Sequence, residues 1–170
     1  MRYVITGGPC TGKTTLLEGL ARKGTLNLPE SARQIIAEEQ NKPYGVLPWT
    51  DLERFQYEVI KRQQQNEKRT KSGIYFLDRG LVDCLAYIEK DGIQPSNKMY
   101  SQIKSASYDK VFLLDQLDVY ENDSGRKEDR FEAGKIHGHI EAAYKFLGYD
   151  IIRVPNMGKK ERLNFVLGGI

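Results

Sequence analysis

The chain has 170 residues, enough for a substantial buried core, and we expect residues 1–170 to form a single domain. It is 39% apolar and 29% charged, as soluble globular proteins are, and it has no run near the ~18 apolar residues of a membrane-spanning helix. The net charge of +3 suits a small anionic ligand and argues against nucleic acid as a partner. MRYVITGG shows no signal-peptide pattern, and Cys10 and Cys84 match no metal or redox spacing. The sequence therefore predicts a cytoplasmic protein and leaves the oligomeric state open.

Short strand-like runs alternate with helical stretches along the whole chain. The strands are expected at residues 2–6, 25–28, 74–77, 111–114 and 151–154. The capping-box patterns SARQ and TDLE predict helices that begin with Ser31 and Thr50 as caps. Helical spacing of apolar residues predicts a helix after the first strand, one over 136–147 and a short one over 163–167. This alternation predicts βαβ units and a three-layer α/β/α fold around a parallel sheet.

The first strand is followed by GGPCTGKTT, Gly7 to Thr15, which satisfies the P-loop pattern in full. Its glycines let successive backbone N–H groups point inward to bind phosphate, and the helix that begins near Lys13 adds its positive dipole end. Lys13 is expected to reach the β- and γ-phosphates, Thr14 to bind Mg²⁺ and Thr15 to contact the α-phosphate. The residues of this loop predicted to bind ATP are Gly8, Pro9, Cys10, Thr11, Gly12, Lys13, Thr14 and Thr15. Cys10 is interpreted as a small residue at a crowded turn, with an activated thiol as the alternative.

The P-loop pattern is shared by three classes of protein to which this chain could belong: GTPases, AAA-type motors and small phosphotransferases. A GTPase should carry Asn-Lys-x-Asp to recognise guanine, but neither Asn-Lys pair, at Asn41 or Asn97, leads to that Asp. A AAA-type motor needs an acidic pair after its second motif strand and a helical lid domain. Here that strand ends in Asp78-Arg79, and too little chain remains for a lid domain. A small phosphotransferase needs a strand-end carboxylate, an acceptor-binding carboxylate with an arginine, and a basic lid, and the sequence offers a candidate for each.

Candidates for the acceptor side follow the second and third strands. Asp78 is expected at the carboxyl edge of the sheet, where it can hold Mg²⁺ or accept a hydroxyl proton, and Arg79 can pair an acceptor phosphate or orient Asp78. Asp115 ends the fourth strand in the same way and is a rival for Asp78. Glu30 is expected at the same edge to bind an acceptor hydroxyl, with Arg33 on the same side of the helical turn to bind a phosphate. The alternative for both pairs is a solvated surface position.

A polar segment at about 120–132 follows the fourth strand and is interpreted as a lid. Its Arg126 is expected to close over the transferring phosphoryl group and stabilise its charge, with a solvated charged face as the alternative. Tyr44 and Trp49 can stack on a nucleobase, or equally well pack within their loop. His137 and His139 are two residues apart, on different helix faces, which argues against a metal pair.

The motifs GGPCTGKTT, LPESARQ, FLDRGLVDCLAY, ENDSGRKEDR and LGYDIIRVP with ERLNFVL together resemble small AAA-labelled P-loop proteins. That family includes the nicotinamide-riboside kinase domain of a bacterial NAD regulator, and thymidylate and deoxynucleoside kinases are more distantly similar. The resemblance covers nearly the whole chain and implies a five-stranded parallel sheet of order 2-3-1-4-5, with ATP and Mg²⁺ as the donor system. It also implies that Glu30 is the hydroxyl-activating acid, Asp78-Arg79 the acidic-Arg motif and Arg126 a lid arginine, and that Pro155 and Asn156 lie near the adenine.

We therefore expect an ATP-dependent phosphotransferase that moves the γ-phosphoryl group to a small nucleoside- or nucleotide-like acceptor. Its predicted catalytic residues are Lys13, Glu30, Asp78 and Arg126, its acceptor-binding residues Glu30, Arg33 and Arg79, and its metal ligands Thr14 and Asp78. The region of about 40–49 matches no substrate pattern, so the acceptor is not identified. One alternative is an ATP-binding regulatory module with little turnover. Another is a polynucleotide 5′-kinase, which the modest charge disfavours.

Overall fold

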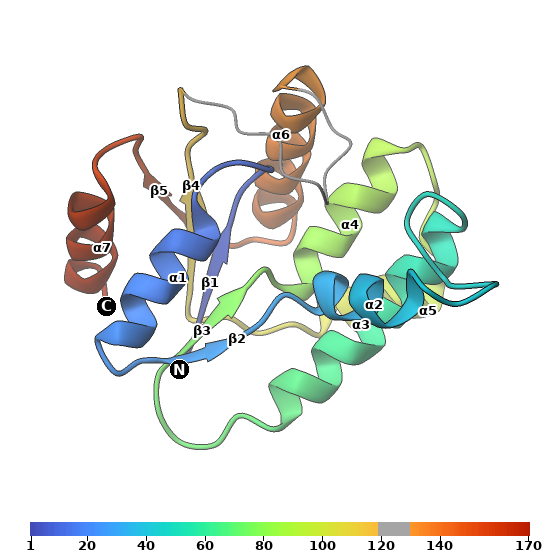
Figure 1. The fold of residues 1–170 in the computed structure, drawn as a ribbon, viewed down its shortest axis with the longest axis horizontal. Helices are drawn as coiled ribbons and strands as arrows, with labels where there is room; N and C mark the ends of the chain where they lie inside the picture. The colour runs from blue at the N-terminus through green and yellow to red at the C-terminus, as the bar shows by residue number, and fades with distance from the viewer. Residues whose placement is uncertain (119–129) are drawn as a thin grey trace.

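The computed structural model describes residues 1–118 and 130–170, and in them a single parallel sheet lies between two helical layers (Figure 1). The strand order is β2-β3-β1-β4-β5, which confirms the predicted fold and strand order. The strands are β1 (Arg2–Thr6), β2 (Leu26–Leu28), β3 (Tyr75–Asp78), β4 (Lys110–Leu114) and β5 (Ile151–Val154). The helices of the described residues are α1 (Lys13–Arg22), α2 (Ser31–Glu39), α3 (Leu52–Lys68), α4 (Leu81–Lys90), α5 (Asn97–Lys104), α6 (Arg130–Phe146) and α7 (Lys159–Gly168).

The two faces of the sheet are covered by different helices because successive strand residues point to opposite sides. On β1, Val4 belongs to a core that the sheet shares with α2 to α6. Its neighbours Tyr3 and Ile5 belong to a second core with α1 and α7. Figure 1 shows α1 and α7 together on one side of the sheet, with the other helices on the opposite side. Both faces of the central strand are therefore buried, which explains the apolar run from Tyr3 to Ile5.

The predicted strand positions agree with the structure apart from small shifts at their ends. β2 starts at Leu26 instead of residue 25, and β4 starts one residue early, at Lys110. β3 runs from Tyr75 to Asp78, so Asp78 is the last residue of the strand and lies opposite Ile5 of β1. This places the Asp78 backbone on a paired strand instead of in the loop that follows.

The two capping-box predictions locate the helices but are wrong about the caps. α2 begins at Ser31 with Glu30 at the cap position, and the buried Ser31 hydroxyl donates to Oε1 of Gln63 on α3 (2.6 Å). α3 begins at Leu52, where the Asp51 side chain accepts a hydrogen bond from the Arg54 backbone N–H (3.0 Å). The Ser31 hydroxyl does not cap α2 because it binds Gln63 on another helix, a contact that the local sequence does not reveal. None of the helices in the described ranges is both long and apolar enough to cross a bilayer.

Candidate functional site

The P-loop connects β1 to α1. At some of its positions the backbone dihedral angles or the surrounding atoms leave room only for small residues. Gly7 and Gly12 have φ values of 138° and 81°, and Cys10 between them also has a positive φ of 57°. A Cβ atom at Gly7 would lie 2.7 Å from the Leu114 carbonyl oxygen, so this position has no room for a side chain. The loop therefore turns sharply at the carboxyl edge of the sheet and directs the N-terminus of α1 toward it.

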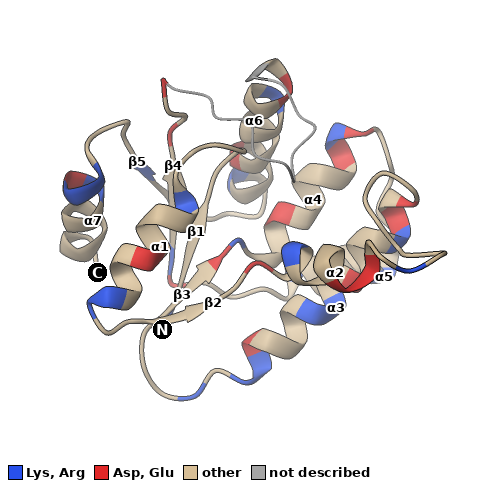
Figure 2. Ribbon diagram, viewed as in Figure 1, with Lys and Arg blue, Asp and Glu red and all other residues tan. Residues whose placement is uncertain are grey.

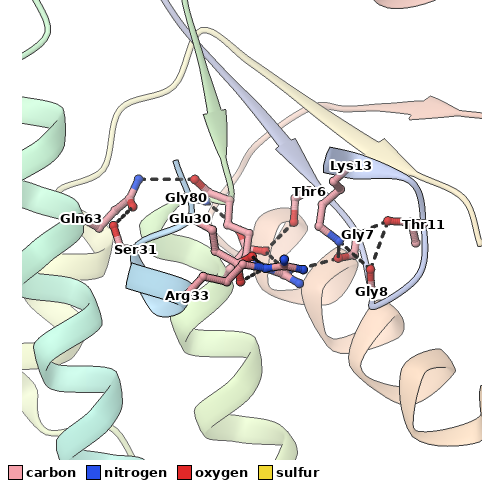
Figure 3. Close-up of polar contacts among 12 residues, drawn as sticks. Thr6, Gly7, Gly8, Thr11, Lys13, Glu30, Ser31, Arg33, Gln63 and Gly80 are labelled. Atoms are coloured by element: carbon pink, nitrogen blue, oxygen red, sulfur yellow. Dashed lines mark hydrogen bonds and ion pairs between the residues drawn. The ribbon is translucent and has the colours of Figure 1, made fainter. Parts of the chain in front are cut away.

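Lys13 folds back onto its own loop. Its Nζ donates to the carbonyl oxygens of Gly7 (3.0 Å) and Gly8 (2.7 Å) and to Oγ1 of Thr11 (3.3 Å), as Figure 3 shows. Burial, assisted by the charge of Arg79, lowers the pKa of Lys13 to about 7. An anion bound at this loop would favour the charged form of Lys13.

Arg79 connects the P-loop to the predicted acceptor side. It follows β3 directly and has a φ of 70°, a conformation that is rare outside glycine. Its Nε donates to Oε1 of Glu30 (3.0 Å), and its Nη1 donates to the Gly7 carbonyl oxygen (3.2 Å). Figure 3 shows Glu30 and the P-loop residues on either side of this group of contacts, and Figure 2 shows charges of both signs where β2 and β3 end, beside the start of α1. One buried arginine thus spans both halves of the candidate site. Its side chain hydrogen bonds to Glu30, Gly7 and Asp83 among the described residues, and not to Asp78, the residue that one alternative expected it to orient.

Asp83 on α4 holds the Arg79 guanidinium in place by a hydrogen bond. It was not among the predicted site residues. Its Oδ1 accepts hydrogen bonds from Thr6 Oγ1 (2.5 Å) and Arg79 Nη1 (3.1 Å). Its Oδ2 accepts from the Gly80 backbone N–H (2.9 Å) and from the Tyr144 hydroxyl (2.7 Å). The carboxylate is buried, so these four donors replace the water that it lost on folding. The only sequence signal for this role is an acidic residue in the first turn of a helix.

Glu30 lies between two guanidinium groups at the end of β2. Its Oε2 accepts from Nε of Arg33 (3.0 Å) while Oε1 accepts from Arg79, so the predicted Glu30–Arg33 proximity is present. Burial opposes ionisation of Glu30, but Arg79, Lys13 and Arg33 outweigh it, and the pKa of its carboxyl lies below the usual value. Arg33 is half exposed, with 51% of its side-chain surface accessible, and can still reach a ligand.

Asp78 carries a buried oxygen without a hydrogen-bond partner in the described part of the chain, its Oδ1. Burial, followed by the charge of Glu30, raises the pKa of Asp78 to about 6, although Lys13 and Arg79 act in the opposite direction. The rival carboxylate, Asp115, instead forms an ion pair with Arg153 (2.9 Å) at the surface. Of the two strand-end acids, Asp78 is therefore the one with an unsatisfied oxygen beside the P-loop lysine.

Two residues near the C-terminus contact the P-loop and were missed in the sequence. The Gly8 backbone N–H donates to Nδ1 of His137 on α6 (3.2 Å). Arg162 on α7 donates through Nη1 to the Thr11 carbonyl oxygen (2.5 Å) and through Nε to that of Pro155 (2.9 Å). No local motif marks either residue, because each contact joins segments far apart in the chain.

The remaining predicted residues are placed as follows. Thr14 and Thr15 are exposed in the first turn of α1. Pro155 and Asn156 are exposed after β5, with Nδ2 of Asn156 donating to Asp118 Oδ2 (2.8 Å). Arg126 and most of the predicted lid lie outside the described residues.

The comparisons with known proteins agree with this architecture. A family model described as an AAA domain matches residues 2–162. The chain belongs to this family. No curated protein sequence matches it. The family match confirms the resemblance to AAA-labelled P-loop proteins that the motifs indicated.

Solved structures of nucleoside and nucleotide kinases share the fold. A thymidylate kinase from Ehrlichia chaffeensis has a TM-score of 0.70 at 14% identity, with 99% of this chain and 97% of that chain covered. A deoxyadenosine kinase from M. mycoides, solved with dCMP and dCDP, has a TM-score of 0.68 at 16% identity, with the same coverage. The NadR protein in complex with NR has a TM-score of 0.74 at 17% identity; 98% of this chain is covered but only 49% of the NadR chain. At such identities the likeness concerns the fold.

Proposed function

We propose that this protein transfers the γ-phosphoryl group of ATP to a small nucleoside- or nucleotide-like acceptor. The observation that carries the proposal is the position of Arg79, whose guanidinium hydrogen bonds to Glu30 and to the Gly7 carbonyl of the P-loop. A site for ATP binding alone requires only the loop and its lysine. A carboxylate held against that loop by a buried arginine adds a group suited to bind an acceptor hydroxyl.

ATP would bind through the P-loop N–H groups, with Lys13 moving from the loop carbonyls to the β- and γ-phosphates. The unsatisfied Oδ1 of Asp78 and the exposed hydroxyl of Thr14 fit Mg²⁺, which favours oxygen ligands and usually retains waters and phosphate oxygens in its shell. Mg²⁺ would neutralise charge on the phosphate oxygens during transfer. Pro155 and Asn156 would lie near the adenine, and Arg126 would act from the lid.

The acceptor side divides two tasks between two carboxylates. Glu30 stays ionised because of its arginines, so it suits hydrogen bonding to an acceptor hydroxyl. Without a metal ion the pKa of Asp78 is raised to about 6, which suits a group that receives a proton near neutral pH. Mg²⁺ bound at its Oδ1 would lower this pKa and make Asp78 a metal ligand instead. The exposed Arg33 offers a guanidinium to an acceptor phosphate. The proteins that share the fold include a thymidylate kinase, a deoxyadenosine kinase and a protein in complex with NR, which supports an acceptor of nucleoside type.

The test is acceptor-dependent ADP release from ATP with a panel of nucleosides, nucleoside monophosphates, nicotinamide riboside and 5′-hydroxyl oligonucleotides. We expect at least one small acceptor to raise ADP release well above the rate with water, and Lys13→Ala to abolish it. Lys23→Ala, at the exposed far end of α1, is the matched control and should retain activity. ATP binding without any acceptor-stimulated release would select the regulatory-module alternative, and transfer only to oligonucleotides would select the polynucleotide kinase.

A further inference from the structure

Arg162 joins three backbone segments at the carboxyl edge of the sheet. It lies in the first turn of α7 and is only 4% exposed. Its Nη1 donates to the Thr11 carbonyl of the P-loop (2.5 Å), its Nη2 to the Asp115 carbonyl after β4 (3.0 Å) and its Nε to the Pro155 carbonyl after β5 (2.9 Å). A single side chain thus holds together the segments that follow three adjacent strands of the sheet, β1, β4 and β5.

This guanidinium binds peptide carbonyls instead of a carboxylate. The Asp115 side chain pairs with Arg153 (2.9 Å), and Arg162 uses the Asp115 backbone oxygen instead. Burial lowers the pKa of Arg162, although an arginine remains charged at neutral pH. Within residues 1–118 and 130–170 no carboxylate is in contact with Arg162. Burial of a charge without an opposite charge in contact is costly, so this arrangement calls for a role beyond packing.

The geometry of the Thr11–Gly12 peptide indicates that role. The described peptide bonds are all trans, and in a trans peptide the C=O and N–H point in opposite directions. Because the Thr11 oxygen points to Arg162, the Gly12 N–H points away from α7. A Cβ atom on Gly12 would lie 3.4 Å from Arg162 Nη1, so the guanidinium packs directly against this peptide.

We propose that Arg162 is a positioning residue that fixes the Thr11–Gly12 peptide with its N–H toward the α- and β-phosphates of the donor nucleotide. The inference rests on the proposed ATP binding by the P-loop. A flipped peptide would present a carbonyl oxygen to the phosphates and repel them. The bond to Pro155 extends the same constraint to the segment that follows β5.

Calorimetric titration with ADP tests the role, using Arg162→Lys, Arg162→Met and, as the control, Arg153→Gln. Lysine keeps the charge but cannot bridge three carbonyls, and methionine keeps only the apolar stem. We expect both Arg162 variants to bind ADP about tenfold more weakly or worse, since hydrogen bonds to a charged group are lost. Arg153→Gln, which removes an exposed arginine near the same edge, should stay within about twofold.

An Arg162 variant that unfolds cooperatively and binds ADP within about twofold of the wild type would overturn the proposal. If neither variant folds, ¹⁵N NMR of the wild type decides. ADP should then shift the Arg162 Nε–H resonance and slow its solvent exchange, and an unchanged signal refutes the role. Absence of ADP binding by the wild type overturns this proposal as well. By contrast, ADP binding without transfer to any acceptor contradicts only the proposed function.

Discussion

The backbone N–H of Gly8 in the P-loop donates a hydrogen bond to Nδ1 of His137 on α6 (3.2 Å). A Cβ atom on Gly8 would lie 2.7 Å from the Ala133 carbonyl oxygen and 3.1 Å from the His137 Cβ. The helix that follows the predicted lid is therefore in direct contact with the loop expected to hold the nucleotide. This contact leads to two predictions.

The first prediction concerns the protonation of His137. Burial, followed by Asp115 acting in the opposite direction, leaves the pKa of His137 below its usual value; Glu141 also favours the charged form, while Arg153 and Lys13 disfavour it. The pKa of His137 is lower in the folded protein than in the unfolded chain. Its neutral form therefore contributes its full stability to the fold above the unfolded-state pKa of about 6.5, and this contribution is lost as the pH falls through the folded-state pKa.

The measurement is thermal unfolding of the wild type and His137→Asn at pH 7.5 and pH 5. Asparagine offers Oδ1 as an acceptor near the Nδ1 position and does not titrate. We expect the wild type to lose more stability than this variant on acidification, and His137→Ala to be about 1 kcal/mol less stable than the wild type at pH 7.5. Equal acid sensitivity in the wild type and His137→Asn would show that the contact does not titrate. His139→Asn, two residues away, is the control for general effects of histidine loss.

The second prediction concerns the close approach at Gly8. Gly8→Ala should destabilise the protein by about 1–3 kcal/mol, because the added methyl group meets backbone atoms of α6 that cannot move independently. Gly138→Ala, on the same helix, adds a methyl group with no atom within 4 Å and should instead stabilise the protein by about 0.5–1 kcal/mol. Urea unfolding measures both, and a neutral Gly8→Ala would show that the helix does not pack as tightly as described.

A third prediction separates the catalytic effect of Asp83 from its structural effect. Asp83→Asn should lower phosphoryl transfer, because it weakens the hydrogen bond that holds Arg79 toward Glu30 and Gly7. Tyr144→Phe removes a donor to the other carboxylate oxygen and should cost about 1 kcal/mol of stability with little effect on transfer. In an Arg79→Met background, Asp83→Asn should lower kcat no further, and independent losses in kcat would contradict a role through Arg79.

A fourth prediction follows from the buried Asp78 carboxyl. The pKa of Asp78 is raised from 3.8 to about 6. Keeping the carboxyl ionised in the folded protein therefore lowers the free energy of unfolding by up to about 3 kcal/mol above pH 6, and this cost is absent below the unfolded-state pKa. Asp78→Asn should therefore unfold at higher temperature than the wild type at pH 8 without magnesium, and the difference should disappear near pH 4. The same variant should have lost transfer activity. A lower unfolding temperature for Asp78→Asn at pH 8 would contradict a net cost of keeping the Asp78 carboxyl ionised in the folded protein.

The sequence predicted the P-loop and the neighbourhood of Glu30, Arg33 and Arg79 because these depend on local patterns. The strand order was implied only by the resemblance to known P-loop proteins. The apolar runs identify buried parallel strands, and the carboxyl ends of such strands meet at one edge. The predicted caps Ser31 and Thr50 were wrong. The Ser31 hydroxyl donates to Gln63 on another helix, and the side chain of Asp51 caps α3 in place of Thr50.

The sequence by itself therefore determined which residues make up the candidate site: a P-loop with the carboxylate of Glu30 and the arginines Arg33 and Arg79 nearby. Only the tertiary structure decided how these groups are held. The bonds from Thr6 to Asp83, from Gly8 to His137 and from Arg162 to Thr11 join residues 77, 129 and 151 positions apart. Hydrogen-bond partners at such separations are set by the packing of helices on a common sheet, and no periodicity or spacing along the chain encodes which of them meet.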